Sequence, residues 1–203
     1  MPEMPVLARI LCTSPPYRLF ARRVLLPWAL QGAIPSGEVL EIGSGSGAMA
    51  GELLKRFPEL HLVATDYDPE MVTVAQRTLA RFGERVIVQR VDASALPFED
   101  GRFDLVLSVA MLHHVGAWER ALAEAIRVLR PGGQFLGYDL IHSAPHRHRN
   151  QNRHHKGHDG GPGTTRMMTA EELRTELGCL PVKDVRTRRA PILPALRFTA
   201  TRA

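Results

Sequence analysis

Three alternating glycines directly after a short apolar stretch constrain this chain more than any other feature. Residues 39–47 read Val-Leu-Glu-Ile-Gly-Ser-Gly-Ser-Gly, with Glu41 inside the expected strand. Gly43, Gly45 and Gly47 allow positive φ angles and let the backbone approach a ligand with no Cβ atom in the way. The helix that follows such a turn directs free N–H groups at the bound molecule. The segment therefore predicts a nucleotide-type cofactor, although it also satisfies the dinucleotide fingerprint.

Apolar and helical stretches alternate along the chain. Strands are expected at 38–42, 60–66, 85–91, 103–108 and 134–141. Most are continuously apolar, as parallel strands are when both faces of the sheet are covered. Weaker alternation at 185–189 and 196–200 predicts a closing antiparallel pair at the sheet edge. The pattern predicts an α/β fold with a doubly wound, mostly parallel sheet, whose ligands bind beyond the carboxyl ends of the strands.

Two of the expected helices have clear start signals. Asp68 can cap a helix that Gly83 ends. Thr169 and Glu172 have the spacing of a capping box at the start of a later helix.

Two further helices are bounded by prolines. The amphipathic segment 18–30, with a break at Pro27, is expected to lie across the open end of the sheet. Another helix is expected to run from Trp118 to Leu129 and to end at the Pro-Gly-Gly of 131–133.

The length of 203 residues favours a single domain that buries roughly 70% of the surface of its unfolded chain. We divide it into an amino-terminal helical cap (1–35), a cofactor-binding core (36–141), a mobile loop (142–166), and a carboxy-terminal helix with edge strands (167–203). Cys12 and Cys179 have no metal-ligand spacing, so reduced thiols and a cytoplasmic location are expected. The amino terminus has neither the pattern of a secretory signal nor the length of a membrane span.

Residues 142–166 carry most of the net charge. The segment holds five Lys and Arg residues against one Asp, which is +4 of the chain's +5, and six of the nine histidines. It has almost no apolar residues, so a mobile loop is expected. Such a loop could act as a lid, contact phosphates, or bind a metal through the i, i+4 pair His154 and His158. Because no cysteine or settled ligand geometry supports a metal, we predict none.

Two carboxylates follow the next two strands, where an adenosyl group would need them. Asp66 ends the second strand, nineteen residues beyond Gly47, and can accept hydrogen bonds from both hydroxyls of a ribose. Asp92, followed by Ala93, comes after the third strand, where it can accept from an adenine amino group. NAD and S-adenosylmethionine both need the ribose contact.

From residue 38 to 138 the chain resembles the class I S-adenosylmethionine-dependent methyltransferases, particularly the small-molecule group that includes ubiquinone and menaquinone biosynthesis enzymes. The matching segments, in chain order, are Glu41-x-Gly43-x-Gly45-x-Gly47, Asp66, Asp92-Ala93, Leu96-Pro97-Phe98 with Phe103-Asp104, Ser108 through His113-His114, and Leu129-Arg130-Pro131-Gly132-Gly133. The resemblance implies a Rossmann-like, seven-stranded sheet with an antiparallel last strand. It also implies S-adenosyl-L-methionine as the cofactor and S-adenosyl-L-homocysteine as the product.

The same resemblance implies roles for individual residues. The implied cofactor-binding set is Glu41, Gly43, Ser44, Gly45, Gly47, Asp66, Tyr67, Asp92, Ala93 and Ser108. The glycines would cradle the methionine moiety, with Glu41 supporting their loop. Asp66 would hold the ribose and Tyr67 would pack on the adenine. Asp92 and Ala93 would bind the adenine edge.

The activated methyl group of a sulfonium asks little of a protein beyond orientation. Holding a nucleophile in line at roughly 3 to 3.5 Å can supply about 7 to 11 kcal/mol, so no covalent residue is required. An O-methylation would gain from a base with a pKa near neutral, and His113 and His114 follow the fourth strand at the ligand end of the sheet. Packing or hydrogen bonding is the alternative role of this pair.

We therefore expect a methyltransferase with a small, lipophilic acceptor. Three other functions stay open, one of which is a cofactor-binding protein without catalytic activity. A nucleic-acid methyltransferase could use the basic loop, but the Ser-Pro-Pro-Tyr type of signature that holds a base amino group is absent after the fourth strand. Residues 14–17 do read Ser-Pro-Pro-Tyr, but they precede the glycine strand and are interpreted as a proline-fixed turn entering the first helix. An NAD-dependent oxidoreductase would leave Asp92-Ala93 and the turn at 129–133 unexplained.

Overall fold

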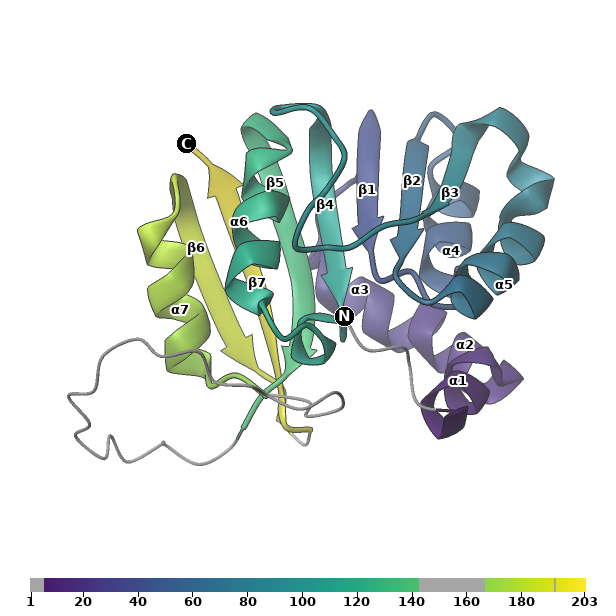
Figure 1. The fold of residues 1–203 in the computed structure, drawn as a ribbon, viewed down its shortest axis with the longest axis horizontal. Coiled ribbons are helices and arrows are strands. Elements are labelled where there is room, and N and C mark those ends of the chain that lie inside the picture. Colours follow the sequence, from purple (N-terminus) through teal and green to yellow (C-terminus); the bar gives the residue numbers. More distant parts are fainter. Residues whose placement is uncertain (1–5, 143–166, 192) are drawn as a thin grey trace.

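The computed structural model describes residues 6–142, 167–191 and 193–203, and one seven-stranded sheet organises them (Figure 1). The strands are β1 Glu38–Ile42, β2 His61–Asp66, β3 Val86–Arg90, β4 Phe103–Val109, β5 Leu129–Leu140, β6 Val182–Arg189 and β7 Ala195–Arg202. Their order is β3-β2-β1-β4-β5-β7-β6. Neighbours among β1 to β5 pair in parallel, whereas β7 is antiparallel to both β5 and β6. The predicted doubly wound sheet with an antiparallel last strand is confirmed.

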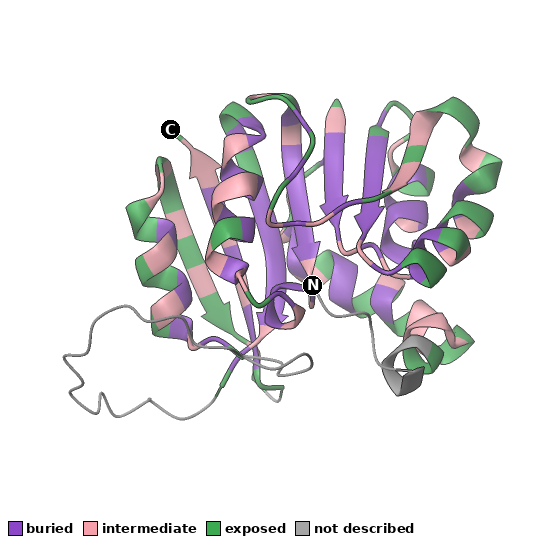
Figure 2. Cartoon of the chain, in the orientation of Figure 1, coloured by how far each residue is buried: buried purple, intermediate pink, exposed green. Residues whose placement is uncertain are grey.

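Helices cover both faces of the sheet. They are α1 Val6–Thr13, α2 Pro15–Phe20, the π-helical turn η1 Ala21–Leu25, α3 Leu26–Leu30, α4 Ala48–Arg56, α5 Pro69–Leu79, the 3₁₀ turn η2 Ala80–Arg85, the 3₁₀ turn η3 Leu112–His114, α6 Trp118–Arg127 and α7 Ala170–Cys179. Buried side chains of α3, α4 and α5 form one core with the sheet, and those of α6 and α7 form another. Figure 2 shows the central strands buried between these layers.

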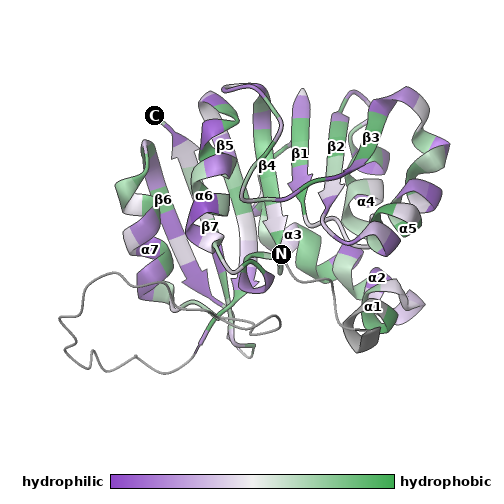
Figure 3. Cartoon of the chain, viewed as in Figure 1, coloured by the Kyte–Doolittle hydropathy of each residue, from purple (hydrophilic) through white to green (hydrophobic). Residues whose placement is uncertain are grey.

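The edge of the sheet formed by β6 differs from its centre. β6 alternates between half-buried and exposed residues and is largely hydrophilic in Figure 3, whereas β1 and β2 are buried along almost their whole length. This is the pattern of a strand with one face open to solvent.

The predicted amino-terminal caps are confirmed, but the predicted end at Gly83 is wrong, because α5 ends at Leu79 and Gly83 lies within η2. The Asp68 side chain accepts a hydrogen bond from the backbone N–H of Glu70 at the start of α5. Thr169 and Glu172 form a reciprocal capping box at the start of α7, which satisfies two free N–H groups.

The prediction for the end of α6 is wrong. The helix ends at Arg127, and Leu129 already pairs with Phe103 as the first residue of β5. Residues 130–133 form an irregularity inside this strand, where Gly132 has φ +80°, and regular pairing resumes at Gln134. The Pro-Gly-Gly sequence therefore makes a bulge in a strand rather than a stop at the end of a helix.

The amino-terminal helix begins earlier than predicted and has no break at Pro27. Helical backbone runs from Pro15 through η1 to Leu30, and Gln31 ends it with φ 55°. Pro27 lies in the first turn of α3, a position where proline is tolerated. In Figure 1, α1 and α2 lie at the carboxyl edge of β1 and β2.

Two expectations concern regions or features beyond this core. The basic loop expected at 142–166 lies, from residue 143 onward, outside the described residues. Within the part of the chain that the structure describes, every helix is too short or too polar to cross a membrane.

Candidate functional site

The turn between β1 and α4 has the conformation that its glycines predict. Gly43, Gly45 and Gly47 have φ angles of +73°, +53° and +71°. A Cβ atom on Gly43 would lie 2.2 Å from Cγ of Met111, and one on Gly47 would lie 3.1 Å from Cδ1 of Leu79, whereas one on Gly45 would meet nothing within 4 Å. Gly43 and Gly47 thus permit close packing, while Gly45 leaves the backbone open to a ligand.

Asp66 ties the end of β2 to this turn. One oxygen of its carboxylate accepts a hydrogen bond from the backbone N–H of Gly45 at 2.8 Å, and the other accepts from Asp68 N–H at 3.0 Å. Burial raises the pKa of Asp66, and these two N–H groups act against that rise. The carboxylate therefore lies at the start of the glycine turn, on the side where a ligand would meet the open backbone.

Asp92 lies at the same edge of the sheet as Asp66. Asp66 is in register with Arg90 on the neighbouring strand β3, so Asp92 follows two residues beyond the paired position. The carboxylate accepts hydrogen bonds from the backbone N–H and hydroxyl of Ser94. Partial burial would raise the pKa of Asp92, but the bonds from Ser94 hold it below its usual value. The two carboxylates thus share one rim.

Tyr67 and Ala93 complete the adenine-side residues of the predicted set. One face of the Tyr67 ring is covered by the guanidinium of Arg90, which lies 5.1 Å from the ring centroid. Ala93 is buried in the core next to the half-buried Asp92. Beyond the ends of β2 and β3, these residues place an aromatic ring and a small apolar side chain next to the carboxylate of Asp92.

Glu41 is a buried acid with an oxygen that has no hydrogen-bond partner. Only 2% of the residue is exposed, and its Oε2 has no partner among the described residues. Burial, together with the nearby charge of Asp66, raises the pKa of Glu41 to about 8. The hydroxyls of Ser44, in the turn, and of Ser108, in β4 between Ile42 and Gly137, also have no partner in the part of the chain that the structure describes. Buried polar atoms are nearly always satisfied, so Oε2 of Glu41 and the hydroxyl of Ser44 are the atoms at this turn that a bound ligand can satisfy.

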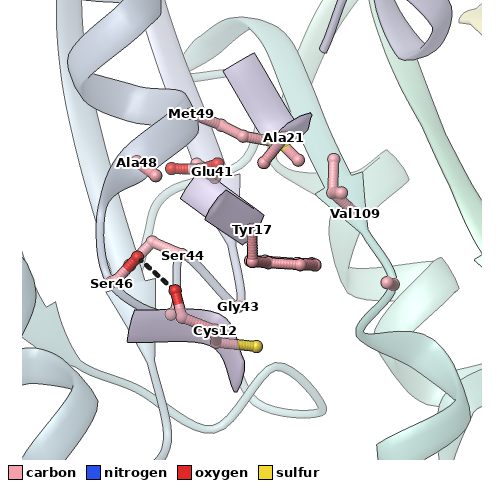
Figure 4. Close-up of a pocket in the computed structure, with 12 residues that line it drawn as sticks. Cys12, Tyr17, Ala21, Glu41, Gly43, Ser44, Ser46, Ala48, Met49 and Val109 are labelled. Carbon is pink, nitrogen blue, oxygen red and sulfur yellow. Dashed lines mark hydrogen bonds between the residues drawn. The ribbon is translucent and has the colours of Figure 1, made fainter. Parts of the chain in front are cut away.

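A small cavity lies over the glycine turn, and we call it the cofactor pocket (Figure 4). It measures about 70 Å³ and is lined by Cys12, Tyr17, Ala21, Glu41, Gly43, Ser44, Gly45, Ser46, Ala48, Met49, Val109 and Ala110. Of the predicted set, Glu41 and residues 43–45 line it directly. Cys12 and Tyr17 close it from the amino-terminal helices, and the Ser46 hydroxyl donates to the Cys12 carbonyl at 3.1 Å. The sequence motifs did not predict that Cys12 and Tyr17 cover the cofactor pocket.

A second, larger cavity adjoins the first, and we call it the acceptor pocket. It measures about 800 Å³ and is lined by Leu11, Cys12, Tyr17, Phe20, Val24, Leu25, Trp28, Ala110, His113, His114, Tyr138, Leu140, Ala190, Pro191, Leu193 and Ala195. Most of these side chains are apolar or aromatic. Cys12, Tyr17 and Ala110 belong to both lists, so the two cavities share a wall.

His113 is held by a buried carboxylate that the sequence analysis missed. Its Nδ1 lies 2.5 Å from Oδ1 of Asp139, a residue of β5 with no exposed surface. Asp139 also accepts hydrogen bonds from the backbone N–H groups of Met111, Leu112 and Leu140. With these donors the carboxylate is fixed in place, and the imidazole is fixed with it. Asp139 lies near the end of a strand, as Asp66 does, and this position is the feature from which a role in the site could have been predicted.

His114 lies against His113 on the same pocket wall. The two ring centroids are 3.9 Å apart. Burial lowers the pKa of His114, and the neighbouring His113 lowers it further. The neutral imidazole is therefore favoured at this position.

The fold and the turn agree with comparison to known proteins. Residues 39–133 match the family model described as "Methyltransferase domain". The crystal structure of a SAM-dependent methyltransferase from Aquifex aeolicus has the same fold, with a TM-score of 0.69 and 17% identity over 99% of this chain and 100% of that chain. The chain thus has the fold of the class I S-adenosylmethionine-dependent methyltransferases and resembles them in sequence over residues 39–133.

Over about half of its length the chain also resembles enzymes of quinone biosynthesis. The demethylmenaquinone methyltransferase of Thermus thermophilus is 37% identical over 98 residues, which cover 48% of this chain and 44% of that protein. The ubiquinone/menaquinone biosynthesis C-methyltransferase UbiE of Methylobacterium nodulans is 38% identical over 106 residues, which cover 51% of this chain and 42% of that protein. The chain thus spans less than half the length of these relatives. The predicted resemblance is confirmed.

Proposed function

We propose that this protein transfers the methyl group of S-adenosylmethionine to a small, largely apolar acceptor. The observation that carries this proposal is the wall of Cys12, Tyr17 and Ala110 that the cofactor pocket and the acceptor pocket share. Because these residues line both cavities, a methyl donor over the glycine turn would lie next to an acceptor in the larger pocket. The aliphatic and aromatic lining of the acceptor pocket favours an apolar ring or chain that carries few polar groups.

The residues of the cofactor pocket suit S-adenosylmethionine, which supplies an activated sulfonium methyl group when bound. The orphaned Oε2 of Glu41 can accept from its ammonium group, and the open backbone at Gly45 admits its methionine part. Asp66 would hold the ribose hydroxyls. Tyr67, Asp92 and Ala93 would bind the adenine. Gly47 would act through helix packing, and Ser44 and Ser108 would offer hydroxyls.

His113 is our proposed base in the acceptor pocket. If its Nδ1–H donates to Asp139, its Nε2 is left as an acceptor for a proton that the substrate loses during transfer. The buried carboxylate would stabilise the imidazolium that results. Tyr17 cannot serve in this way, because burial raises its pKa to about 12. Asp139 is thus a positioning residue, and His114 is a second, less well-oriented candidate.

Titration calorimetry with S-adenosylhomocysteine tests the cofactor part of the proposal. We expect one binding site per chain. We also expect weaker binding by Asp66→Asn, which removes a charge-assisted hydrogen bond to the ribose. If the ligand does not bind while NADH fluorescence is quenched by the protein, the oxidoreductase alternative replaces this proposal.

Methyl transfer from labelled S-adenosylmethionine to a panel of apolar phenols and quinols tests the role of His113. His113→Gln should lower kcat by about 10²- to 10⁴-fold, while the Kd for S-adenosylhomocysteine is unchanged. His114→Gln is the matched comparison and should cost less. Full activity of His113→Gln would contradict the assignment.

A further inference from the structure

Four exposed hydrophobic side chains surround the mouth of the acceptor pocket. Leu11, Phe20, Val24 and Leu193 all line that pocket, yet they are 56%, 44%, 49% and 52% exposed. We call these four residues the apolar rim. Phe20 and Val24 are four positions apart, so they share one face of the helical segment. Scattered apolar residues are ordinary on a surface, but a group around one opening marks an interaction site.

Arginines stand next to the apolar rim. Arg23 is exposed beside Val24, and Arg188 and Arg189 are exposed at the end of β6, just before the turn that carries Leu193. Arg189 and Leu193 also line one small cavity together. These residues place positive charge on both sides of the pocket mouth.

The two segments that build the rim carry charge of one sign only. Residues 10–37 contain three arginines and no acidic residue, and residues 185–197 contain four arginines and no acidic residue. The rest of the chain holds all 21 of the Asp and Glu residues. The segments around the mouth of the acceptor pocket are therefore positively charged, as is the basic segment 142–166.

We propose that this face docks on an anionic lipid bilayer, with the acceptor pocket opening onto the membrane surface. A helix lying in the interface inserts its apolar side chains among the acyl chains and places its arginines at the lipid phosphates. The helices α1 and α2 with the turn η1 supply Leu11, Phe20 and Val24, and the turn between β6 and β7 supplies Leu193 as a second point of contact. An acidic protein or a nucleic acid would match the arginines, but neither accounts for a ring of exposed hydrophobic side chains. The docking itself does not depend on the proposed function. Only the inference that the methyl acceptor comes from the membrane rests on it.

Sedimentation with lipid vesicles tests the docking directly, with the whole chain and no cofactor. We expect binding to vesicles of phosphatidylcholine mixed with phosphatidylglycerol to exceed binding to phosphatidylcholine alone by more than about tenfold. The triple variant Phe20→Ser, Val24→Ser, Leu193→Ser keeps every charge and should bind the anionic vesicles more than about tenfold more weakly. The triple variant Arg23→Gln, Arg188→Gln, Arg189→Gln should lose the preference for anionic vesicles.

Matched controls alter the same residue types elsewhere on the surface. Ile87→Ser removes a hydrophobic side chain that is 53% exposed on β3, and Lys55→Gln with Arg77→Gln removes two exposed charges from α4 and α5. Both control variants should bind vesicles like the unaltered chain. Circular dichroism and thermal unfolding establish that each variant is folded.

Two outcomes would overturn the docking proposal. One is equal binding to anionic and neutral vesicles. The other is unaltered binding by the apolar-rim variant, which would leave charge alone as the attraction and favour an acidic protein or a nucleic acid as the partner. Absence of S-adenosylhomocysteine binding in a chain that still binds vesicles would instead overturn only the proposed function.

Discussion

Glu41 couples the cofactor pocket to the pH dependence of folding. The side chain is buried beside Asp66, and its pKa is raised to about 8. The folded state therefore keeps Glu41 protonated up to about pH 8, whereas the unfolded chain loses that proton near the ordinary pKa of a glutamate. Since the folded state binds more protons in this range, stability is greatest below the unfolded pKa and is lost as the pH rises through about 8.

We expect Glu41→Gln to flatten this dependence. Between about pH 5 and pH 8 the free energy of unfolding of the unaltered chain should fall by an amount on the order of a few kcal/mol more than that of the variant. Urea denaturation at the two pH values measures the difference. Glu59→Gln, an exposed substitution on the same chain, is the control and should leave the slope unchanged. Equal slopes for Glu41→Gln and the unaltered chain would contradict the buried, protonated state.

A substitution at Gly45 has two expected effects, backbone strain and obstruction of the ligand, and they can be measured separately. Gly45→Ala should cost about 1–2 kcal/mol of stability, because an L-residue is strained at φ +53° even where the Cβ has free space. It should also weaken S-adenosylhomocysteine binding by more than about tenfold, because the new methyl group occupies the open side of the turn. Gly32→Ala, at φ +86° and also with free space, should carry a similar strain and leave binding intact. Calorimetry and urea denaturation distinguish the two effects.

The most informative element is the pair α1 and α2, which covers the cofactor pocket. The space beneath Cys12 and Tyr17 is about 70 Å³, well below the roughly 300 Å³ or more of typical ligand sites. If the cofactor fills this space, we expect these helices to move outward and the hydrogen bond from Ser46 to the Cys12 carbonyl to break. Burial raises the pKa of the Cys12 thiol, so that thiol is a slow nucleophile while the helices are closed.

Thiol alkylation reports this movement residue by residue. Saturating S-adenosylhomocysteine should speed the alkylation of Cys12 and leave that of the exposed Cys179 unchanged. Mass spectrometry of the labelled peptides measures both rates in one sample. A Cys12 rate that does not respond to ligand binding would show that the helices stay in place.

Elements with strong local signals could be predicted from the sequence, and elements defined by distant contacts could not. The capped helices at Asp68 and Thr169 and the glycine turn after β1 depend on residues within a few positions of each other. The start of β5 was misplaced because Leu129 pairs with Phe103, a contact that no local pattern reveals. The cofactor cover was missed for a similar reason, since Tyr17 is remote in sequence from the turn that it covers.

The site follows the same rule. Each acid at the end of β2 and β3 was predicted because it ends a recognisable strand. Asp139 was counted within the expected strand 134–141, so its contact with His113, 26 residues away, was not anticipated. Whether the predicted residues bind the cofactor stays a prediction that the calorimetry above addresses.

At the scale of the whole molecule, β7 joins the edge strand β6 to β5 and so to the rest of the sheet. Phe198 of β7 is fully buried, and its ring centroid is 5.0 Å from that of Phe135 in β5. Phe198→Ala should lower the free energy of unfolding by about 3–5 kcal/mol, because it leaves a cavity between the sheet and its helical layer. Ile34→Ala, at a residue that is 79% exposed, should change it by less than about 0.5 kcal/mol. A urea-unfolding midpoint for Phe198→Ala equal to that of the Ile34 control would contradict this account.

The reversed direction of β7 has a practical consequence. The strand ends beside Gln134 near the beginning of regular pairing in β5, so the last residue emerges at the edge of the sheet opposite both pockets (Figure 1). A tether attached beyond Ala203 would leave the ligand-facing edge unobstructed. Chains immobilised through that end on a sensor chip should therefore meet dissolved cofactors and suspended vesicles in the same orientation.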